Sequence, residues 1–223
     1  MWLNDVQISK GAIAKWRKSL LSTSPSHLVI DQLFQPDLLA QVCRILQQEQ
    51  RWQSQQHTYA ALYVNAATWQ KTPTAQRFVQ RDLWPRQPGI ALEFLQFLRS
   101  AEFMALLSRI FSVQLTDQNV ADPAINTNYF RLGGADFINQ HADDSPGREV
   151  CMLLYLNENW QEDFGGELVF QGNASQPLQI TPLFNRCVLF DPASPGAEHW
   201  VNALTAAAAQ RYRYNVTSWY WSE

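Results

Sequence analysis

The sequence predicts a mainly β fold with supporting α-helices, and two observations lead to this prediction. Before about residue 120, apolar residues recur at helical spacing, whereas from about residue 125 short apolar runs alternate with clusters of Gly, Pro, Asn and Ser. Short strands separated in this way are typical of a β-sandwich or a barrel. We therefore expect one domain over residues 1–223, in which residues 1–120 form mainly helical support with an opening strand and residues 121–223 form the β core.

The composition favours a folded protein of the cytoplasm. With 223 residues, of which 46% are hydrophobic, the chain is long enough to bury a substantial core. Cys43, Cys151 and Cys187 lack CxxC spacing, and the last two stand inside apolar runs, so we expect free thiols in a reducing compartment. The first residues contain no apolar signal segment and no run reaches the length of a membrane span, so we expect no membrane partner.

The charge balance gives no reason to expect a nucleic-acid partner. The formal net charge is −3 and the chain has only four lysines, whereas binding to a polyanion usually needs a basic surface. Basic residues do gather near the start, at Lys10, Lys15, Arg17 and Lys18. We interpret them as a solvated helix face, and a contact arm is the alternative.

The N-terminal half is predicted to contain one strand and three helices. Residues 26–34 form the strand, and a helix follows with Pro36 in its first turn, where a missing N–H costs nothing. Residues 89–98 and 101–111 are two further helices, the second with Ser100 as its N-cap. The apolar residues of the first helix keep helical spacing at Leu38, Leu39, Val42, Ile45 and Leu46.

The C-terminal half is predicted to consist of strands. Residues 149–157 are a near-continuous apolar run, as expected of a strand covered on both faces. Three further runs, at 165–170, 186–190 and 211–221, are separated by turn-forming residues. Four consecutive alanines at 206–209 are interpreted as a loop or a short helical turn.

A histidine and two aspartates lie close together in the segment FINQHADDSPG, residues 137–147. If residues 137–143 are extended, His141 and Asp143 point to the same face and can share a cation, whereas Asp144 points to the opposite face. The pair alone is more typical of a hydrogen-bonded surface histidine beside a turn.

A second histidine in the β half changes this balance. His199 follows the apolar run RCVLF and can complete a site of two histidines and one carboxylate with His141 and Asp143. Such a triad is associated with non-haem Fe(II) oxygenases, because it leaves three positions on the metal open. His27 and His57 lie in the helical half and are interpreted as ordinary surface or boundary residues.

From Tyr129 to the C-terminus the chain resembles the iron(II)/2-oxoglutarate-dependent dioxygenases, nearest the prolyl-hydroxylase branch. The motifs of the family appear here in order as HAD (141–143), LLYLNENW (153–160), GGELVF (165–170), TPLFNRCVLF (181–190), AEHW (197–200) and RYNVTSWYW (213–221). Residues 28–48 also look like the N-terminal support of that family. The resemblance implies a double-stranded β-helix, a cupin-like jelly roll, with the N-terminal helices packed on one sheet. Matched by position, His141, Asp143 and His199 correspond to the iron ligands.

The resemblance also assigns the binding of 2-oxoglutarate. Arg213 matches the arginine that pairs with the distal carboxylate, and a guanidinium suits this role because it is always charged and can bind two oxygens. Tyr155 and Tyr129 match tyrosines that hydrogen-bond the cosubstrate. Asn215 stands where many relatives carry Ser, and its amide can still donate to a carboxylate of 2-oxoglutarate. Arg211 would share a face with Arg213 in an extended strand, but the run from Arg213 to the aromatic end matches the family without a gap. Arg211 is therefore interpreted as a strand-entry residue near the mouth that can contact substrate.

The implied activity is hydroxylation of a substrate C–H bond, with release of succinate and CO₂. Fe(II) is the metal, 2-oxoglutarate and O₂ are the cosubstrates, and ascorbate is a candidate auxiliary reductant. The expected substrate is a prolyl residue of a protein or peptide partner, and a free amino acid or other small molecule is the alternative. The Ser-, Gln- and Thr-rich residues 53–76 are either a lid or docking loop or a solvated connector.

Two other classes stay open at this point. One is a metal-dependent cupin-like enzyme or a non-catalytic metal-binding jelly roll, against which Arg213 and Tyr155 argue, because neither is needed without a dicarboxylate. The other is a member of the same superfamily directed at nucleic acid, against which the low lysine content argues.

Overall fold

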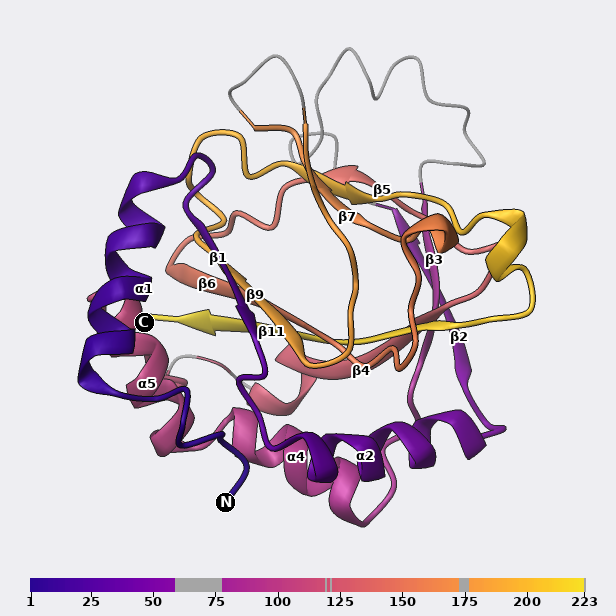
Figure 1. The fold of residues 1–223 in the computed structure, drawn as a ribbon, viewed down its shortest axis with the longest axis horizontal. Helices are drawn as coiled ribbons and strands as arrows, with labels where there is room; N and C mark the ends of the chain where they lie inside the picture. The colour runs from indigo at the N-terminus through magenta and orange to yellow at the C-terminus, as the bar shows by residue number, and fades with distance from the viewer. Residues whose placement is uncertain (59–77, 119, 121, 173–176, 223) are drawn as a thin grey trace.

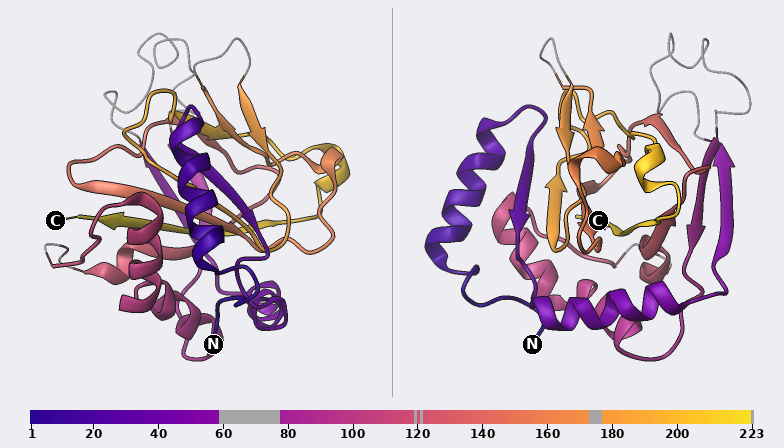
Figure 2. Two further views of the ribbon diagram at one scale, coloured as in Figure 1. Left: turned by 60° about the vertical axis from the view of Figure 1, so that its left-hand side comes forward. Right: turned by 45° about the vertical axis from the view of Figure 1, so that its right-hand side comes forward.

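A computed structural model describes residues 1–58, 78–118, 120, 122–172 and 177–222. Within these residues two antiparallel sheets face each other, and helices lie on the outer side of the larger one (Figures 1 and 2). The larger sheet has the strand order β1 (His27–Asp31), β9 (Arg186–Phe190), β6 (Arg148–Tyr155), β11 (Arg213–Trp221), β4 (Thr127–Leu132), β3 (Phe78–Leu83), β2 (Gln53–Thr58). The smaller sheet has the order β5 (Ile138–His141), β10 (His199–Val201), β7 (Leu168–Phe170), β8 (Leu178–Ile180).

Helices from the N-terminal half support the larger sheet. Those longer than one turn are α1 (Lys10–Ser22), α2 (Pro36–Gln48), α4 (Ile90–Leu98) and α5 (Ala101–Phe111). Pro36 lies in the first turn of α2, and the Ser100 side chain accepts a hydrogen bond from the backbone N–H of Phe103 at the start of α5, both as predicted. The basic residues near the start lie on α1 and are exposed, as expected of a solvated helix face.

Two apolar cores lie on opposite faces of the larger sheet. One joins the helices to the sheet and contains, for example, Leu39, Phe94 and Leu154. The other lies between the two sheets and contains Tyr155 and Phe170. Strand β6 contributes to both cores because successive side chains point to opposite faces, which explains its near-continuous apolar run. The predicted fold class, mainly β with helices packed on one sheet, is confirmed.

The predicted strands are present, but four of the five are shorter than predicted. Strand β9 has the predicted bounds, whereas the run 165–170 gives only the three-residue strand β7. Gly165 and Gly166 have φ of +72° and +75°, and a Cβ on Gly165 would lie 2.4 Å from the carbonyl oxygen of Ala203. These residues therefore form a turn that approaches another backbone closely. Strand β11 begins at Arg213, so Arg211 lies outside it.

The helical half also contributes strands to the larger sheet. Strand β1 was predicted, but β2 and β3 were not, and they pair with each other and extend the sheet beyond β4. Of the segment 53–76, for which a lid was considered, residues 53–58 form β2, and residues 59–76 lie outside the described part of the chain. The alanines 206–208 form a short 3₁₀ turn.

The three cysteines are buried and free, as predicted. Within the described residues, no helix has both the length and the apolar character needed to cross a bilayer.

Candidate metal and cosubstrate site

The smaller sheet brings the two candidate histidine ligands face to face. His141 ends β5 and His199 begins β10, and these residues are direct partners across the antiparallel pair. Each ring is fixed by its Nδ1, which donates to the carbonyl of the residue two positions earlier, Asn139 at 2.8 Å and Ala197 at 2.9 Å. This tautomer leaves a lone pair on each Nε2, the arrangement that metal-binding histidines use.

Asp143 completes the cluster from the segment that follows β5. Its Oδ1 lies 3.6 Å from His141 Nε2, and its Oδ2 lies 3.7 Å from His199 Nε2. One ligand atom from each of the three residues lies within 4.8 Å of the others. Asp144 is exposed and lies outside the cluster, in agreement with the alternation argument.

The protonation states at the cluster suit a divalent cation. Burial, helped by the neighbouring His199, lowers the pKa of His141 to about 3, so the imidazole is neutral near pH 7. Burial alone would raise the pKa of Asp143, but His141, His199, the indole of Trp219 and Arg148 hold it below its ordinary value. Two histidines and one carboxylate fit Fe(II) and related metals.

A buried arginine and a buried tyrosine lie deeper between the sheets. Arg213 donates from Nε to the carbonyl of Gly166 at 2.7 Å and from Nη1 to Asn215 Oδ1 at 2.9 Å, which leaves Nη2 buried with no hydrogen-bond partner. The Tyr155 hydroxyl is likewise buried and without a hydrogen-bond partner. Orphaned buried donors are uncommon in folded proteins and need an explanation. Two of them side by side fit a bound carboxylate, which supplies several acceptor lone pairs.

One cavity joins Arg213 to the metal-binding cluster. Alternate residues of β11, namely Arg213, Asn215, Thr217 and Trp219, line it together with the metal-binding cluster, and its empty space is about 570 Å³ when the open mouth is included. The Asn215 amide donates to Thr217 Oγ1 at 2.9 Å and accepts from Arg213, so it holds the guanidinium in place. The residues therefore fit a metal ion and a dicarboxylate in one space.

Tyr129 is not part of this cavity, which corrects the prediction that it contacts the cosubstrate. On β4 it pairs with Val216 of β11, and this pair points toward the helices, whereas the neighbouring pair of Phe130 and Asn215 points into the space between the sheets. The Tyr129 hydroxyl donates to the carbonyl of Ala91 at 2.8 Å. The reason is strand parity, since a residue one position away faces the opposite side.

Arg211 was interpreted as a strand-entry residue near the mouth, exposed or in contact with substrate. Arg211 is exposed and precedes β11, with its guanidinium 4.7 Å from the centre of the Phe164 ring. It lines a surface groove with Trp160 and Tyr212, not the cavity that contains the metal-binding cluster.

Two residues of the site were missed by the sequence analysis. Trp219 has a readable signal, because it stands six residues after Arg213 on the same strand and so shares its face. The sequence contains no comparable signal for Arg81, because this residue comes from β3, in the half that was expected to be helical. It is buried, lies over the Phe130 ring at 3.5 Å from its centre and lines the cavity.

Comparisons with known proteins agree with this site. Residues 127–221 match the family model of the 2OG-Fe(II) oxygenase superfamily. Over 151 residues, 65% of the chain, the sequence is 26% identical to the prolyl 3-hydroxylase OGFOD1 of Mus musculus. The matched part is 26% of that protein, so the chain spans about a quarter of its length.

Solved structures of prolyl hydroxylases share the fold. The prolyl-4-hydroxylase of Pseudomonas putida superposes with a TM-score of 0.64 at 18% identity, covering 94% of this chain and 98% of that one. The prolyl hydroxylase of Trichoplax adhaerens, solved with a peptide fragment of the hypoxia inducible factor oxygen degradation domain, superposes with a TM-score of 0.62 at 19% identity. That match covers 98% of this chain and 96% of the other. At these identities the similarity supports the predicted double-stranded β-helix.

Proposed function

We propose that the chain, whose residues 127–221 match the family model of the 2OG-Fe(II) oxygenase superfamily, is a prolyl-hydroxylase-like member of that superfamily and hydroxylates a substrate C–H bond. His141, Asp143 and His199 would hold Fe(II), and Arg213 Nη2 and the Tyr155 hydroxyl would hold 2-oxoglutarate. Bound together, the metal and 2-oxoglutarate supply the oxidising power: O₂ is consumed, 2-oxoglutarate becomes succinate and CO₂, and one oxygen atom enters the substrate. Ascorbate is proposed as an auxiliary reductant that keeps the iron in the Fe(II) state.

The observation that carries the proposal is a buried donor without a partner, Arg213 Nη2, in the same cavity as the metal-binding cluster. Arg213 Nη2 has no hydrogen-bond partner, although Arg213 lines the space that contains His141 and His199. The Tyr155 hydroxyl is likewise without a partner, and its ring centre lies 4.8 Å from Arg213 Cζ. A jelly roll that only binds a metal has no use for a buried guanidinium beside the metal. A dicarboxylate with one end at the metal and the other end at Arg213 satisfies both donors.

The residues of the chain divide the work. Arg213 pairs with the distal carboxylate and Tyr155 donates its hydroxyl to the same group, while Asn215 keeps the guanidinium in position. The walls of the cavity are largely apolar, with Leu168 and Phe190 among them, so water is excluded from the reacting centre. The protein thus supplies binding, orientation and a dry environment, and the hard chemistry comes from the bound groups.

The proposed substrate is a prolyl residue of a protein or peptide. The support is the branch of the superfamily, in which the named relatives are prolyl hydroxylases acting at different ring positions. The alternative substrate is a free amino acid or another small molecule.

The experiment measures succinate formed from 2-oxoglutarate in the presence of Fe(II), O₂ and a library of proline-containing peptides. The wild-type protein is expected to form succinate and to add one oxygen atom to a proline, detected by mass spectrometry. His141→Ala and Asp143→Ala are expected to abolish both products, while Asp144→Ala, which removes the neighbouring exposed carboxylate, retains them. Succinate formation that is equal in all four proteins would refute the site. Oxidation of a free amino acid without any oxidised peptide would favour the alternative substrate.

A further inference from the structure

The carboxylate of the metal-binding cluster is less firmly placed by the backbone than the two histidines. His141 and His199 are paired residues of a sheet, but residues 142–145 after β5 have no regular secondary structure. A carboxylate on such a segment can rotate unless side chains hold it. Asp143 therefore needs partners beyond its own backbone.

Trp219 is such a partner. Its indole Nε1 donates to Asp143 Oδ2 at 3.0 Å. The indole lies on the cavity face of β11 and lines the same space as the metal-binding cluster. Because Nε1 donates to Oδ2, this hydrogen bond fixes the rotation of the Asp143 carboxylate. Oδ1 receives no hydrogen bond from the indole.

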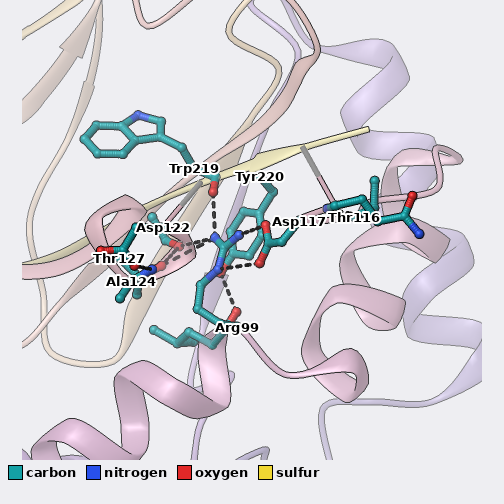
Figure 3. Close-up of polar contacts among 11 residues, drawn as sticks. Arg99, Thr116, Asp117, Asp122, Ala124, Thr127, Trp219 and Tyr220 are labelled. Carbon is teal, nitrogen blue, oxygen red and sulfur yellow. Dashed lines mark hydrogen bonds and ion pairs between the residues drawn. The ribbon is translucent and has the colours of Figure 1, made fainter. Parts of the chain in front are cut away.

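The backbone of Trp219 is anchored from the helical side. Arg99, at the C-terminus of α4, donates from Nη1 to the Trp219 carbonyl at 2.6 Å and lies over the Tyr220 ring, 4.5 Å from its centre. The guanidinium is in turn paired with Asp117. Figure 3 shows this arrangement, with Arg99 between Asp117 and the Trp219 carbonyl and the indole directed away from them.

Arg148 holds the other side of Asp143. It donates from Nη1 to the Asp143 carbonyl, and the same nitrogen lies 4.0 Å from Oδ1. Its guanidinium also lies over the Trp219 ring, at 5.3 Å from its centre. Trp219 and Arg148 thus contact each other as well as the aspartate, so the three side chains form one unit.

We propose that Trp219 is a positioning residue that fixes the Asp143 carboxylate for metal binding, with Arg99 and Asp117 anchoring Trp219 from behind. The inference rests on the proposed function, because it takes the metal site as given. Removing a side chain that hydrogen-bonds a metal ligand commonly weakens metal affinity by about 10- to 100-fold. The indole N–H, rather than the bulk of the ring, carries the effect.

The test compares the binding of Co(II) by the metal-free protein, without 2-oxoglutarate. Trp219→Phe keeps an aromatic ring and loses the N–H, and it is expected to raise the Co(II) dissociation constant about 10-fold or more. The visible absorption of bound Co(II) is expected to change, because a carboxylate free to rotate alters the ligand geometry. A second variant places benzothienylalanine at position 219, which keeps the shape of the indole and replaces N–H by sulfur, and the same change is expected.

Trp200→Phe is the matched control. Trp200 lies beside His199 on β10, and its indole donates to Asn202 Oδ1 at 3.1 Å, so the substitution removes a similar hydrogen bond that does not reach a ligand. Wild-type affinity and absorption are expected for this variant. If both variants at position 219 bind Co(II) as the wild type does, or if only Trp219→Phe differs, the N–H has no positioning role and the inference is wrong. Equal Co(II) binding by the wild type and His141→Ala would instead overturn the proposed metal site itself.

Discussion

The side chains of Arg213 and Tyr155 lie against each other, with Arg213 Cζ 4.8 Å from the centre of the Tyr155 ring. They come from the adjacent strands β11 and β6, and both point into the space between the sheets. Each ends in a buried polar atom that lacks a hydrogen-bond partner. These two unsatisfied donors therefore destabilise the free protein until a ligand with acceptor oxygens binds.

Tyr155→Phe is expected to weaken the binding of 2-oxoglutarate while leaving metal binding intact. A hydrogen bond to a charged group contributes about 1.5–3 kcal/mol, which corresponds to roughly 10- to 100-fold in affinity. The apparent constant for 2-oxoglutarate in the succinate assay measures this effect, and Co(II) titration serves as the control. An unchanged apparent constant for 2-oxoglutarate would show that the Tyr155 hydroxyl does not contribute to its binding.

The pH dependence of the same interaction follows from the burial of Tyr155. Burial raises the pKa of its hydroxyl to about 12, and the neighbouring Arg213 offsets only part of this rise. The hydroxyl therefore keeps its proton, and remains a donor, across the range near pH 10 in which an ordinary tyrosine ionises. The affinity for 2-oxoglutarate, measured by calorimetry on the Co(II)-loaded protein, is expected to show no loss attributable to tyrosine between about pH 8 and pH 10. A titration step near pH 10 that disappears in Tyr155→Phe would contradict this.

Tyr129→Phe is expected to affect stability and not the cosubstrate. The substitution removes the donor to the buried carbonyl of Ala91, and an unsatisfied buried group costs about 1–3 kcal/mol. Urea unfolding should show this loss in the free energy of unfolding, while the apparent constant for 2-oxoglutarate stays at the wild-type value. A large rise in that constant would show that Tyr129 contributes to the binding of 2-oxoglutarate.

Arg213→Ala and Arg211→Ala are expected to differ sharply. Losing a buried, charged partner of a carboxylate costs about 2–5 kcal/mol, which is tens- to thousands-fold in affinity. Arg211 lies on the surface over Phe164, so its removal should leave the apparent constant for 2-oxoglutarate nearly unchanged. Metal binding survives in both variants. Arg213→Lys keeps the charge without the planar fork, and an intermediate constant is expected. A greater effect at position 211 would contradict the assignment.

Metal and cosubstrate together are expected to raise the thermal stability of the protein. A ligand present at about 100 times its dissociation constant adds about 2.7 kcal/mol to the free energy of unfolding. For a chain of this size that corresponds to a rise in Tm of roughly 5–10 °C. Differential scanning fluorimetry with Mn(II) and 2-oxoglutarate measures the rise, and His199→Ala is the control that should not respond. Chelation with EDTA should reverse the rise in the wild type.

The metal-binding cluster could be predicted from the sequence because its geometry is mostly local. His141 and Asp143 are two residues apart, and the apolar run before His199 predicts a strand. Arg213 followed from the unbroken run to Trp219. These inferences depend on one strand each, and alternation along a single strand is a short-range rule.

The remaining features depend on how strands pair, which the sequence shows poorly. Tyr129 was assigned from the resemblance to the family, which does not fix the face of the strand to which its side chain points, and the side chain faces the helices. Arg81 reaches the cavity because β3 joins the sheet next to β4, a long-range pairing without a local signal. Arg211 was placed in a strand that in fact begins at Arg213.

The direct pairing of His141 with His199 means that a bound metal also clamps two strands together. Strand β10 has only three residues and pairs in regular register with β7, but its register with β5 is irregular after His199, so backbone pairing fixes its position relative to β5 only weakly. A slip by one residue would turn an imidazole out of the cavity, which a coordinated metal does not allow. Local opening of the smaller sheet is thus coupled to metal loss. Without bound metal, we therefore expect the smaller sheet to show faster amide exchange and earlier proteolytic cleavage than the helix-covered sheet.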